Sequence, residues 1–240
     1  MNEKLDLSIV IPCFNEIDGI EHLVLELKKL EKKLNVSHEF IFVDDGSSDE
    51  TYVKLVNVYQ DRIGKDIKVL KHEKNEGLGT AVKTGILKAE GRYVATMDSD
   101  CTYKPTYLVE MFDIMKQENA DIITASPYHP EGQTQNVPGY RLFLSRTLSN
   151  MYNVVCKGKF YTYTSMFRIY KNDSIKKITF ESKGFLAMSE ILVKGHKKGL
   201  KIIEFPATLT GRKFGISSAK TFSLIKSHIG FIIEILLKRY

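Results

Sequence analysis

The sequence predicts an α/β protein whose mostly parallel, Rossmann-like sheet carries helices on both faces. Apolar segments of strand length alternate with amphipathic helical segments through the first half of the chain. Each strand segment is apolar along its whole length, which is typical of parallel strands that are buried on both faces. The chain has 240 residues, of which 43% are hydrophobic, and this is enough for one large domain or a domain with an appendage.

Strands and helices are predicted to alternate up to residue 100. The strands are expected in short apolar runs: 7–12, 40–43, 67–70 and 93–97. The first helix is predicted from apolar side chains at helical spacing: Ile20, Leu23, Val24, Leu27, Leu30 and Leu34. Ser48 or Asp49 can cap a helix that follows the second strand, and a third helix is expected over 78–89.

The pattern changes after residue 100. A loop rich in residues that break helices and strands is expected at 126–132. The expected helices are 105–117, 139–156 and 184–198. The expected strands are 122–124, 162–170 and 201–209.

The last helix, expected over 222–240, is amphipathic. Its predicted apolar stripe consists of Phe222, Ile225, Ile229, Ile232 and Leu236, with Leu224, Phe231 and Ile235 beside it. Lys226, His228 and Glu234 interrupt the stripe, so no run approaches the ~20 apolar residues that a membrane span needs. Two interpretations stay open: the helix lies on a membrane surface, or it docks onto the domain.

The charge is concentrated at the carboxyl end. Residues 194–240 hold ten Lys and Arg against two Glu, whereas the whole chain carries a net charge of +6. A basic end suggests phosphates, anionic lipid or nucleic acid as partner, and the alternative is a solvated charged face. No RNP-like or helix-turn-helix pattern accompanies the charge, so a nucleic-acid partner is not predicted.

The cysteines and the amino terminus favour a cytoplasmic location. Cys13, Cys101 and Cys156 are widely spaced and odd in number, so they form neither a disulfide framework nor a CxxC metal pattern. The first residues lack a basic segment followed by a long apolar one, so no signal peptide is expected.

Polar groups follow three of the predicted strands. They are Asn15-Glu16, residues 44–47 and Asp98-Ser99-Asp100. Because parallel strands end at one edge of a sheet, we expect these carboxylates to converge, which is costly unless a cation or hydrogen-bond donors compensate. The i, i+2 spacing of Asp98 and Asp100 puts both on one side, where two hard oxygen ligands suit Mg²⁺ or Mn²⁺ carrying a phosphorylated substrate. Taken alone, the Asp98-x-Asp100 pair is a weak signal, and its alternative interpretation is a strand end followed by a polar turn.

A glycine pair, Gly77 and Gly79, enters the third helix. Such a turn brings backbone N–H groups close to a phosphate, or it is simply a tight turn. It lacks the first glycine of GxGxxG and follows the third strand, so a dinucleotide fingerprint is disfavoured.

The motifs resemble those of family-2 glycosyltransferases with the GT-A fold. The resemblance covers about residues 6–125, and its motifs are 9–16 (IVIPCFNE), 43–49 (VDDGSSD), Asn75-x-Gly77-x-Gly79 and Asp98-x-Asp100. Within the family the chain is most similar to the dolichol-phosphate mannosyltransferase branch. The segments 165–168, 204–206 and 212–217 are similar to the second half of that branch.

The resemblance implies a site for a nucleotide-diphosphate sugar, GDP- or UDP-linked. Pro12, Phe14 and Glu16 would line the pocket of the base, and Asp45 would lie near the base or ribose. The remaining implied donor contacts are Gly79, Asp98 and Ser99. The implied metal ligands are Asp98, Asp100 and Thr102, the last standing where the branch usually has Gln.

The resemblance also implies the acceptor groups. Arg141 and Ser145 have the spacing that the branch uses for the acceptor phosphate, with Arg212 and Lys220 nearby. An exposed helix arginine is the alternative for Arg141. Glu190 stands where the family carries a Glu-Asp base pair, but a lipid phosphate is already an anion and needs no base.

Together these features predict an inverting hexosyltransferase that acts on a polyprenyl phosphate, bound peripherally at the cytoplasmic membrane face. The predicted parts are a nucleotide-binding half (1–125), an acceptor half (126–215) and a basic helix (216–240). Thr102, Pro127 and Ser218 depart from the branch, so two alternatives stay open. They are transfer to a saccharide hydroxyl, and binding of a nucleotide sugar without turnover.

Overall fold

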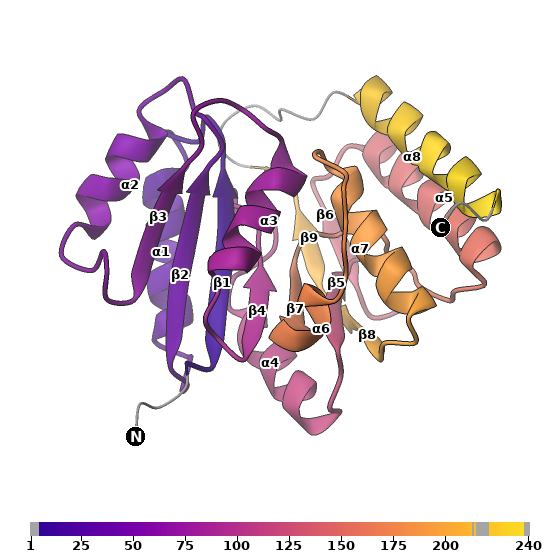
Figure 1. Cartoon of the computed structure of the whole chain (residues 1–240), viewed down its shortest axis with the longest axis horizontal. Coiled ribbons are helices and arrows are strands. Elements are labelled where there is room, and N and C mark those ends of the chain that lie inside the picture. Colours follow the sequence, from indigo (N-terminus) through magenta and orange to yellow (C-terminus); the bar gives the residue numbers. More distant parts are fainter. Residues whose placement is uncertain (1–4, 213, 215–220, 238–240) are drawn as a thin grey trace.

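The computed structural model describes residues 5–212, 214 and 221–237 of the chain. Its main element is a seven-stranded sheet in the order β3-β2-β1-β4-β7-β5-β8 (Figure 1). The strands are β1 (Leu7–Cys13), β2 (His38–Asp44), β3 (Ile67–Lys71), β4 (Tyr93–Thr96), β5 (Ile122–Ser126), β7 (Arg168–Lys171) and β8 (Ile202–Pro206). Among the described strands of this sheet only β7 runs antiparallel to its neighbours. The predicted α/β class with a mostly parallel sheet is confirmed.

The first strands lie where the apolar runs predicted them because both of their faces are buried. Every residue of β1 is buried, and its side chains alternate between two cores. Ile9 and Ile11 belong to the core on one face, and Val10 belongs to the core on the other. Since β1, β2 and β4 are parallel, the polar residues that follow them share one edge of the sheet.

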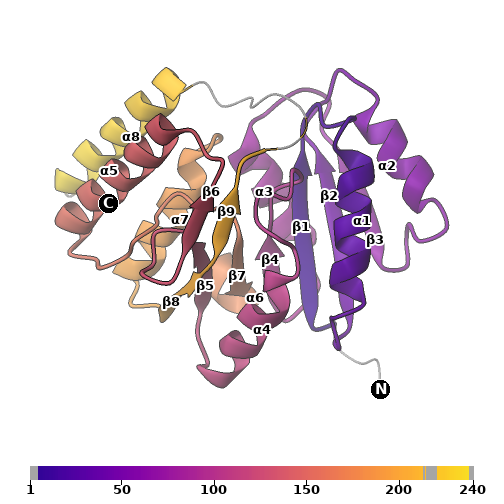
Figure 2. The same ribbon diagram turned by 180° about the vertical axis from the view of Figure 1, so that it is seen from behind.

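Helices cover both faces of the sheet, as Figures 1 and 2 show from opposite sides. One face carries α1 (Ile20–Glu31), α2 (Thr51–Tyr59) and α4 (Tyr107–Gln117). The other carries α3 (Leu78–Lys88), α6 (Asn172–Lys176) and α7 (Leu186–Lys197). The N-cap residue of α2 is Glu50, so the cap predicted at Ser48 or Asp49 was wrong, although the Asp49 carboxylate accepts a hydrogen bond of 2.9 Å from the Thr51 amide.

The predicted strand over 162–170 was wrong in its first part, because β7 begins only at Arg168. The preceding backbone bonds to side chains instead of to a neighbouring strand. The amides of Tyr161 and Thr162 donate to the Glu204 carboxylate, and the amide of Tyr163 donates to Ser149 Oγ. These bonds hold the segment as a loop.

The predicted strand over 201–209 is two strands. After β8 the chain turns into β9 (Thr208–Thr210), which pairs in parallel with β6 (Gln133–Gln135) in a separate two-stranded sheet. Neither short strand has an apolar run, so periodicity gave no signal for this second sheet. It lies beside the carboxyl edge of the main sheet and brings the residues after Thr210 toward that edge.

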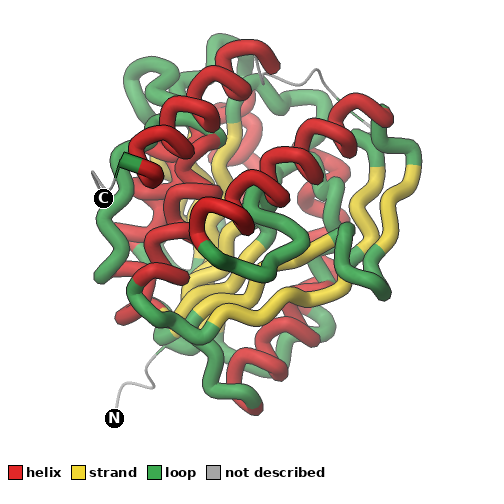
Figure 3. Tube along the Cα trace, turned by 90° about the vertical axis from the view of Figure 1, so that its right-hand side faces the viewer, coloured by secondary structure: helices red, strands yellow, loops and turns green. Residues whose placement is uncertain are grey.

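Two long helices form an outer layer beyond α7. α5 (Gly139–Cys156) and α8 (Thr221–Leu236) lie side by side in Figures 1 and 2, and Figure 3 turns this side toward the viewer. They are joined by a hydrogen bond of 2.7 Å between Tyr152 Oη and His228 Nδ1. Within the described part of the chain, no helix combines the length and apolar character needed to cross a bilayer.

α8 docks through a face that matches the predicted apolar face only in part. His228, Phe231, Ile232 and Ile235 are buried, whereas Ile229 and Leu236 of the predicted stripe are 43% and 62% exposed. The stripe was therefore wrong at those two positions, since His228 bonds to Tyr152 and belongs to the buried face. The side chain of Phe222 and the predicted boundary near 216 lie outside the described residues, and the division into parts stays a prediction.

Candidate active site

A cleft of about 910 Å³ opens at the carboxyl edge of the sheet and extends between α5 and α8. Most of the residues that the sequence proposed for a site line it: Pro12, Phe14, Glu16, Asp45, Asp98, Ser99, Asp100, Thr102, Arg141, Ser145 and Arg212. Gly79 and Glu190 are not among its lining residues. Lys220 lies outside the described residues.

The turn after β1 is fixed by Asn15, which lies in the left-handed region with φ of 53°. Asparagine adopts this conformation more readily than most residues. Its amide donates to Ser47 Oγ at 2.9 Å, and its side-chain Oδ1 accepts from the Ser48 amide at 2.8 Å. The turn after β2 thereby holds the turn after β1, and Phe14 and Glu16 are placed at the cleft.

Asp45 is held by donors on both of its oxygens. The Gly77 amide donates to Oδ2 at 2.8 Å, and the Glu76 amide donates to Oδ1 at 3.0 Å. His72 Nδ1 lies 2.8 Å from the same Oδ1, and His72 Nε2 lies 3.0 Å from Thr84 Oγ1. Two donors of the glycine turn therefore serve a carboxylate of the protein.

Gly79 has a packing role in this structure. Its amide donates to the Lys183 carbonyl at 2.6 Å, and an added Cβ would meet the Ser182 carbonyl oxygen at 2.2 Å. The start of α3 is thus pressed against the 182–184 segment. Because of this contact, Gly79 lies beneath the cleft wall. The resemblance implied instead that Gly79 contacts the donor.

Three carboxylates gather around Arg212. Its Nε lies 3.0 Å from Oδ2 of Asp100, and its Nη2 is bonded to Oε1 of Glu16. Asp98 lies beside them, and burial together with the nearby Asp100 charge raises the pKa of the Asp98 carboxyl well above its usual range. Burial also raises the pKa of Glu16, although Arg212 opposes the shift. The structure thus places Arg212 against these carboxylates, whereas the resemblance implied that it lies near the acceptor phosphate.

The oxygen donors of this cluster fit a hard divalent cation. Asp98 and Asp100 supply carboxylates, and Thr102, whose amide donates to Asp100 Oδ1 at 3.1 Å, adds a hydroxyl at the cleft. Among the described residues, no group of three or more His, Cys, Asp or Glu side chains is arranged to hold a metal. Mg²⁺ and Mn²⁺ commonly complete their shell with water and substrate phosphates, so two Asp suit a cation that arrives with a diphosphate.

Arg141 and Ser145 lie on α5 at the other end of the cleft. Ser145 Oγ is 2.8 Å from Thr164 Oγ1, and Arg141 Nε donates to the hydroxyl of the exposed Tyr140 at 3.2 Å. Arg141 is exposed at the mouth of the cleft. Its guanidinium therefore keeps further donors that can meet an anion in the cleft.

Glu190 is buried away from the cleft. Its carboxylate accepts the amides of Glu181 and Ser182 and pairs with Lys194 at 2.7 Å. Burial raises the pKa of Glu190, but these bonds outweigh it and lower the pKa overall. The carboxylate fixes the 181–182 backbone, and a catalytic role for Glu190 stays a prediction.

Some residues that line the cleft or position its side chains carried no recognisable signal in the sequence. His72 reaches Asp45 only because β2 and β3 pair in parallel, and His228 enters the cleft wall only because α8 docks on α5. The apolar lining of the cleft was equally hidden, and it includes Val137, Leu142, Leu144, Leu148, Met166 and Leu224.

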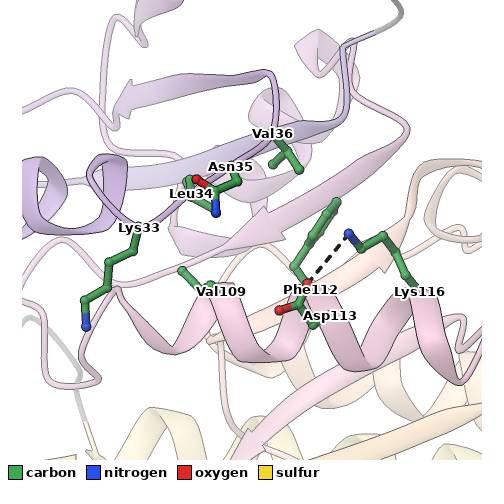
Figure 4. Close-up of a pocket in the computed structure, with 8 residues that line it drawn as sticks. All are labelled: Lys33, Leu34, Asn35, Val36, Val109, Phe112, Asp113 and Lys116. Carbon is green, nitrogen blue, oxygen red and sulfur yellow. Dashed lines mark ion pairs between the residues drawn. The ribbon is translucent and has the colours of Figure 1, made fainter.

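A second hollow, of about 100 Å³, lies between the 33–36 segment and α4 (Figure 4). It is at the amino end of β2, away from the carboxylate cluster. Of its three charged residues, Lys33, Asp113 and Lys116, the last two pair with each other at 3.6 Å. Nothing in this lining matches the chemistry of the larger cleft.

Comparison with known families identifies the chain. Residues 8–179 match the model of Glycosyl transferase family 2. The chain belongs to this family. The resemblance inferred from the four motifs is thereby confirmed.

Three related sequences agree with that membership. The chain is 29% identical over 220 residues to a dolichol-phosphate mannosyltransferase of Pyrococcus furiosus, which covers 90% of this chain and 60% of the relative. It is 35% identical over 130 residues to an uncharacterized glycosyltransferase of Synechocystis, covering 54% of this chain and 40% of the relative. It is 26% identical over 218 residues to a polyprenol monophosphomannose synthase of Mycolicibacterium smegmatis, covering 87% and 79%. The chain thus spans three-fifths or less of the first two relatives.

Solved structures share the fold of this family-2 glycosyltransferase. Glucosyl-3-phosphoglycerate synthase of Mycobacterium tuberculosis, in complex with Mn²⁺, UDP and glucosyl-3-phosphoglycerate, matches with a TM-score of 0.71 at 17% identity, over 98% of this chain and 80% of the other. TarS of S. aureus in complex with UDP matches with a TM-score of 0.61 at 20% identity, over 96% and 66%. At these identities the likeness shows the fold alone, and the expected GT-A fold is confirmed.

Proposed function

We propose that this family-2 glycosyltransferase moves a hexose from a nucleotide-diphosphate sugar to a polyprenyl phosphate, with inversion at the anomeric carbon. The observation that carries the proposal is the absence of an available carboxylate among the described residues on the acceptor side of the cleft. That side offers Arg141, Ser145, Thr164 and an apolar wall. Such a lining suits an acceptor that is already an anion and carries a hydrocarbon chain.

The donor would bind at the carboxyl edge of the sheet. Phe14 and Pro12 offer an apolar surface to the base, and Asp45, fixed by His72 and two backbone amides, offers a rigid acceptor for an N–H of the base or a ribose hydroxyl. Asp98 and Asp100 would hold Mg²⁺ or Mn²⁺. When bound, such a cation neutralises charge on the departing nucleoside diphosphate.

A phosphate acceptor would need no general base for its attack on the sugar. A hydroxyl acceptor must lose a proton as it attacks, which calls for a positioned base. Glu190 is tied to backbone amides and Lys194, and Asp45 is tied to His72 and two amides. A phosphate oxygen attacks without losing a proton, and Arg141 and Ser145 would orient it in the cleft.

The hydrocarbon chain would leave along the apolar wall toward α5 and α8. Beyond the cleft these helices and the residue that follows α8 expose large apolar side chains: Tyr140, Phe143, Met151, Val154, Ile229, Ile233, Leu236 and Leu237. We define these eight residues as the outer apolar face. A peripheral contact of this face with a membrane, on its cytoplasmic side, would bring the lipid acceptor to the cleft.

The relatives support this proposal by their names. Two of them are a dolichol-phosphate mannosyltransferase and a polyprenol monophosphomannose synthase, and both have polyprenyl-type lipids in their names. The solved synthase of M. tuberculosis was crystallised with Mn²⁺ and UDP, which supports a divalent cation and a nucleotide donor here. The base and the sugar are open to experiment.

The test combines ligand binding with product analysis. Thermal shifts with UDP, GDP and their hexose conjugates, with and without Mn²⁺, identify the donor, because a ligand of the native state raises its stability. The donor that stabilises the protein is then incubated with a short polyprenyl phosphate. We expect a lipid-linked sugar phosphate that mild acid cleaves, formed only with the metal.

Transfer to a saccharide hydroxyl is the second candidate. It is favoured by Thr102 and Pro127, which stand where the polyprenyl-phosphate branch has Gln and Arg; the third departure, Ser218, lies outside the described residues. A product that resists mild acid, with no lipid phosphate consumed, would favour this candidate. Metal-dependent binding of a donor with no transfer to either acceptor would favour a binding protein.

A further inference from the structure

Arg212 links two carboxylates of the cleft that are far apart in sequence. Its Nε lies 3.0 Å from Oδ2 of Asp100, and its Nη2 bonds Oε1 of Glu16. The side chains of Arg212, Asp100 and Glu16 are 19%, 16% and 10% exposed. Solvent therefore screens this bridge only in part.

The bridge occupies the carboxylate that is expected to bind a cation. Asp100 Oδ1 accepts the Thr102 amide, and Asp100 Oδ2 accepts Nε of Arg212. A divalent ion held by Asp100 would share this carboxylate with the guanidinium. Two cations so close repel each other strongly in a partly buried site, so metal and Arg212 compete for Asp100.

The charges of the site make an exchange favourable when a diphosphate arrives. When ionised, Glu16, Asp98 and Asp100 carry three negative charges against one positive charge on Arg212. Among the described ion pairs none includes Asp98. A nucleoside diphosphate adds anionic oxygens, and a planar guanidinium binds such oxygens in a bidentate manner. The donor thus offers Arg212 a new partner when the metal takes the old one.

The backbone next to Arg212 is anchored, so the exchange needs only the side chain to move. Thr210 donates to the Thr102 carbonyl through both its amide and its hydroxyl, at 2.9 Å each. Beyond Arg212, the Phe214 ring lies 5.5 Å from the ring of His22 on α1. Arg212 is thereby held within reach of both the carboxylates and the cleft.

We propose that Arg212 is an exchangeable internal cation. It neutralises Glu16 and Asp100 before the donor binds, and it moves to a substrate phosphate when the divalent ion and the diphosphate enter together. This inference rests on the proposed metal-and-nucleotide site. It follows that the metal binds weakly in the absence of nucleotide. It also follows that nucleotide increases the metal affinity by a larger factor when Arg212 is present than when it is replaced.

Mn²⁺ binding to the full chain tests this, measured from the electron paramagnetic resonance signal of free Mn²⁺. Titrations are made without nucleotide, with saturating UDP and with saturating GDP. We expect Arg212→Gln to bind Mn²⁺ alone about ten-fold tighter than the parent chain, a size typical of coupling between sites. The strengthening by nucleotide should shrink by a similar factor. Arg212→Lys, which keeps the charge, should stay near the parent.

Two controls make the result specific. Arg62→Gln removes an arginine that pairs with Glu31 and Asp66 outside the cleft, and it should leave Mn²⁺ binding unchanged. Asp100→Asn should remove Mn²⁺ binding, which shows that the signal reports on this site. If Arg212→Gln fails to fold by circular dichroism, Arg212→Met provides the same comparison with the aliphatic stem retained.

Binding of Mn²⁺ alone by Arg212→Gln, or by Arg212→Met where it takes its place, that equals or is weaker than that of the parent would overturn the proposal. Equal strengthening by nucleotide in the parent and in Arg212→Gln would overturn it as well. Failure of the proposed function can be told apart from failure of this proposal. If the transfer reaction does not occur, no lipid-linked product forms, but the Mn²⁺ affinities of the parent and the variants can still be compared.

Discussion

At the scale of single residues, the cleft depends on polar side chains whose bonding partners come from elsewhere in the fold. Asp45 is buried, yet each oxygen has a backbone amide donor and one also meets His72. Because the carboxylate accepts, Nδ1 of His72 donates, and the hydroxyl of Thr84 meets the other ring nitrogen. His72 is thus a positioning residue for Asp45.

Substitution of His72 should weaken nucleotide binding. In His72→Ala, Asp45 loses one of its donors and gains freedom to turn, which costs about 1–2 kcal/mol of binding, or roughly ten-fold in affinity for the preferred nucleotide. Isothermal titration calorimetry measures this. Thr84→Val removes the outer end of the chain of hydrogen bonds and should have a smaller effect. Unchanged affinity in His72→Ala would show that the amides alone position Asp45.

His228 should make stability depend on pH. Burial lowers its pKa to about 4, so the folded protein holds it neutral, whereas its pKa in an unfolded chain is about 6.5. The unfolded state therefore binds more protons between these values, and stability falls as pH decreases from about 6.5 toward 4, by at most ~1.4 kcal/mol per pH unit. Urea unfolding at several pH values should show a shallower dependence in His228→Gln. An identical slope in both proteins would contradict this assignment.

At the scale of elements, the strands that could be predicted from the sequence were those with a clear apolar pattern. β1 and β2 were recognisable because every position of an apolar run is buried. β6 was not, since its three polar residues carry no apolar pattern, and the strand predicted over 201–209 did not reveal that β9 is separate from β8. The loop before β7 resembled a strand because its aromatic residues are apolar, but its amides bond to Glu204 and Ser149. A local sequence pattern does not reveal hydrogen bonds to side chains that are distant in the sequence.

The contact between α3 and the 182–184 segment depends on Gly79. In Gly79→Ala the new methyl group would meet the Ser182 carbonyl oxygen at 2.2 Å, so backbone must shift. We expect a loss of about 1–3 kcal/mol in the free energy of unfolding, as for other overpacked sites. Gly230→Ala in α8 is the control, because an added Cβ there meets nothing within 4 Å and alanine favours a helix. Equal unfolding midpoints for the two variants would rule out this packing role.

At the scale of the whole molecule, the site combines segments from distant parts of the sequence. Only some of these segments could be predicted to meet. Three strand ends were expected to converge, since parallel strands share an edge, and they do so in one cleft. The partner of Asp100 could not be foreseen, because Arg212 is 112 residues away and arrives through the short second sheet. His228 was interpreted as an interruption of an apolar stripe, because periodicity does not reveal that a buried Tyr152 satisfies it.

The outer apolar face predicts how the molecule meets a membrane. Phe143 is 69% exposed and Ile233 is 50% exposed, so a charge at either position disturbs no core. We expect the parent chain to sediment with vesicles that contain anionic lipid, and Phe143→Glu and Ile233→Glu to sediment substantially less. Leu87→Glu, at a position on α3 that is 66% exposed, is the control for a charge placed elsewhere. Equal sedimentation of the parent and the two outer-face variants would refute the membrane contact.

The choice of acceptor tests the central claim most directly, because among the described residues the acceptor side of the cleft offers Arg141 and Ser145 and no carboxylate free to act as a base. The measurement compares transfer of labelled hexose to a short polyprenyl phosphate with transfer to the matching polyprenol, under identical metal and donor. We predict transfer to the phosphate, none to the alcohol, and a loss of at least about ten-fold in Arg141→Ala, the size expected when a charged hydrogen bond is removed. Efficient transfer to the alcohol or to a saccharide hydroxyl, with the phosphate untouched, would contradict the claim.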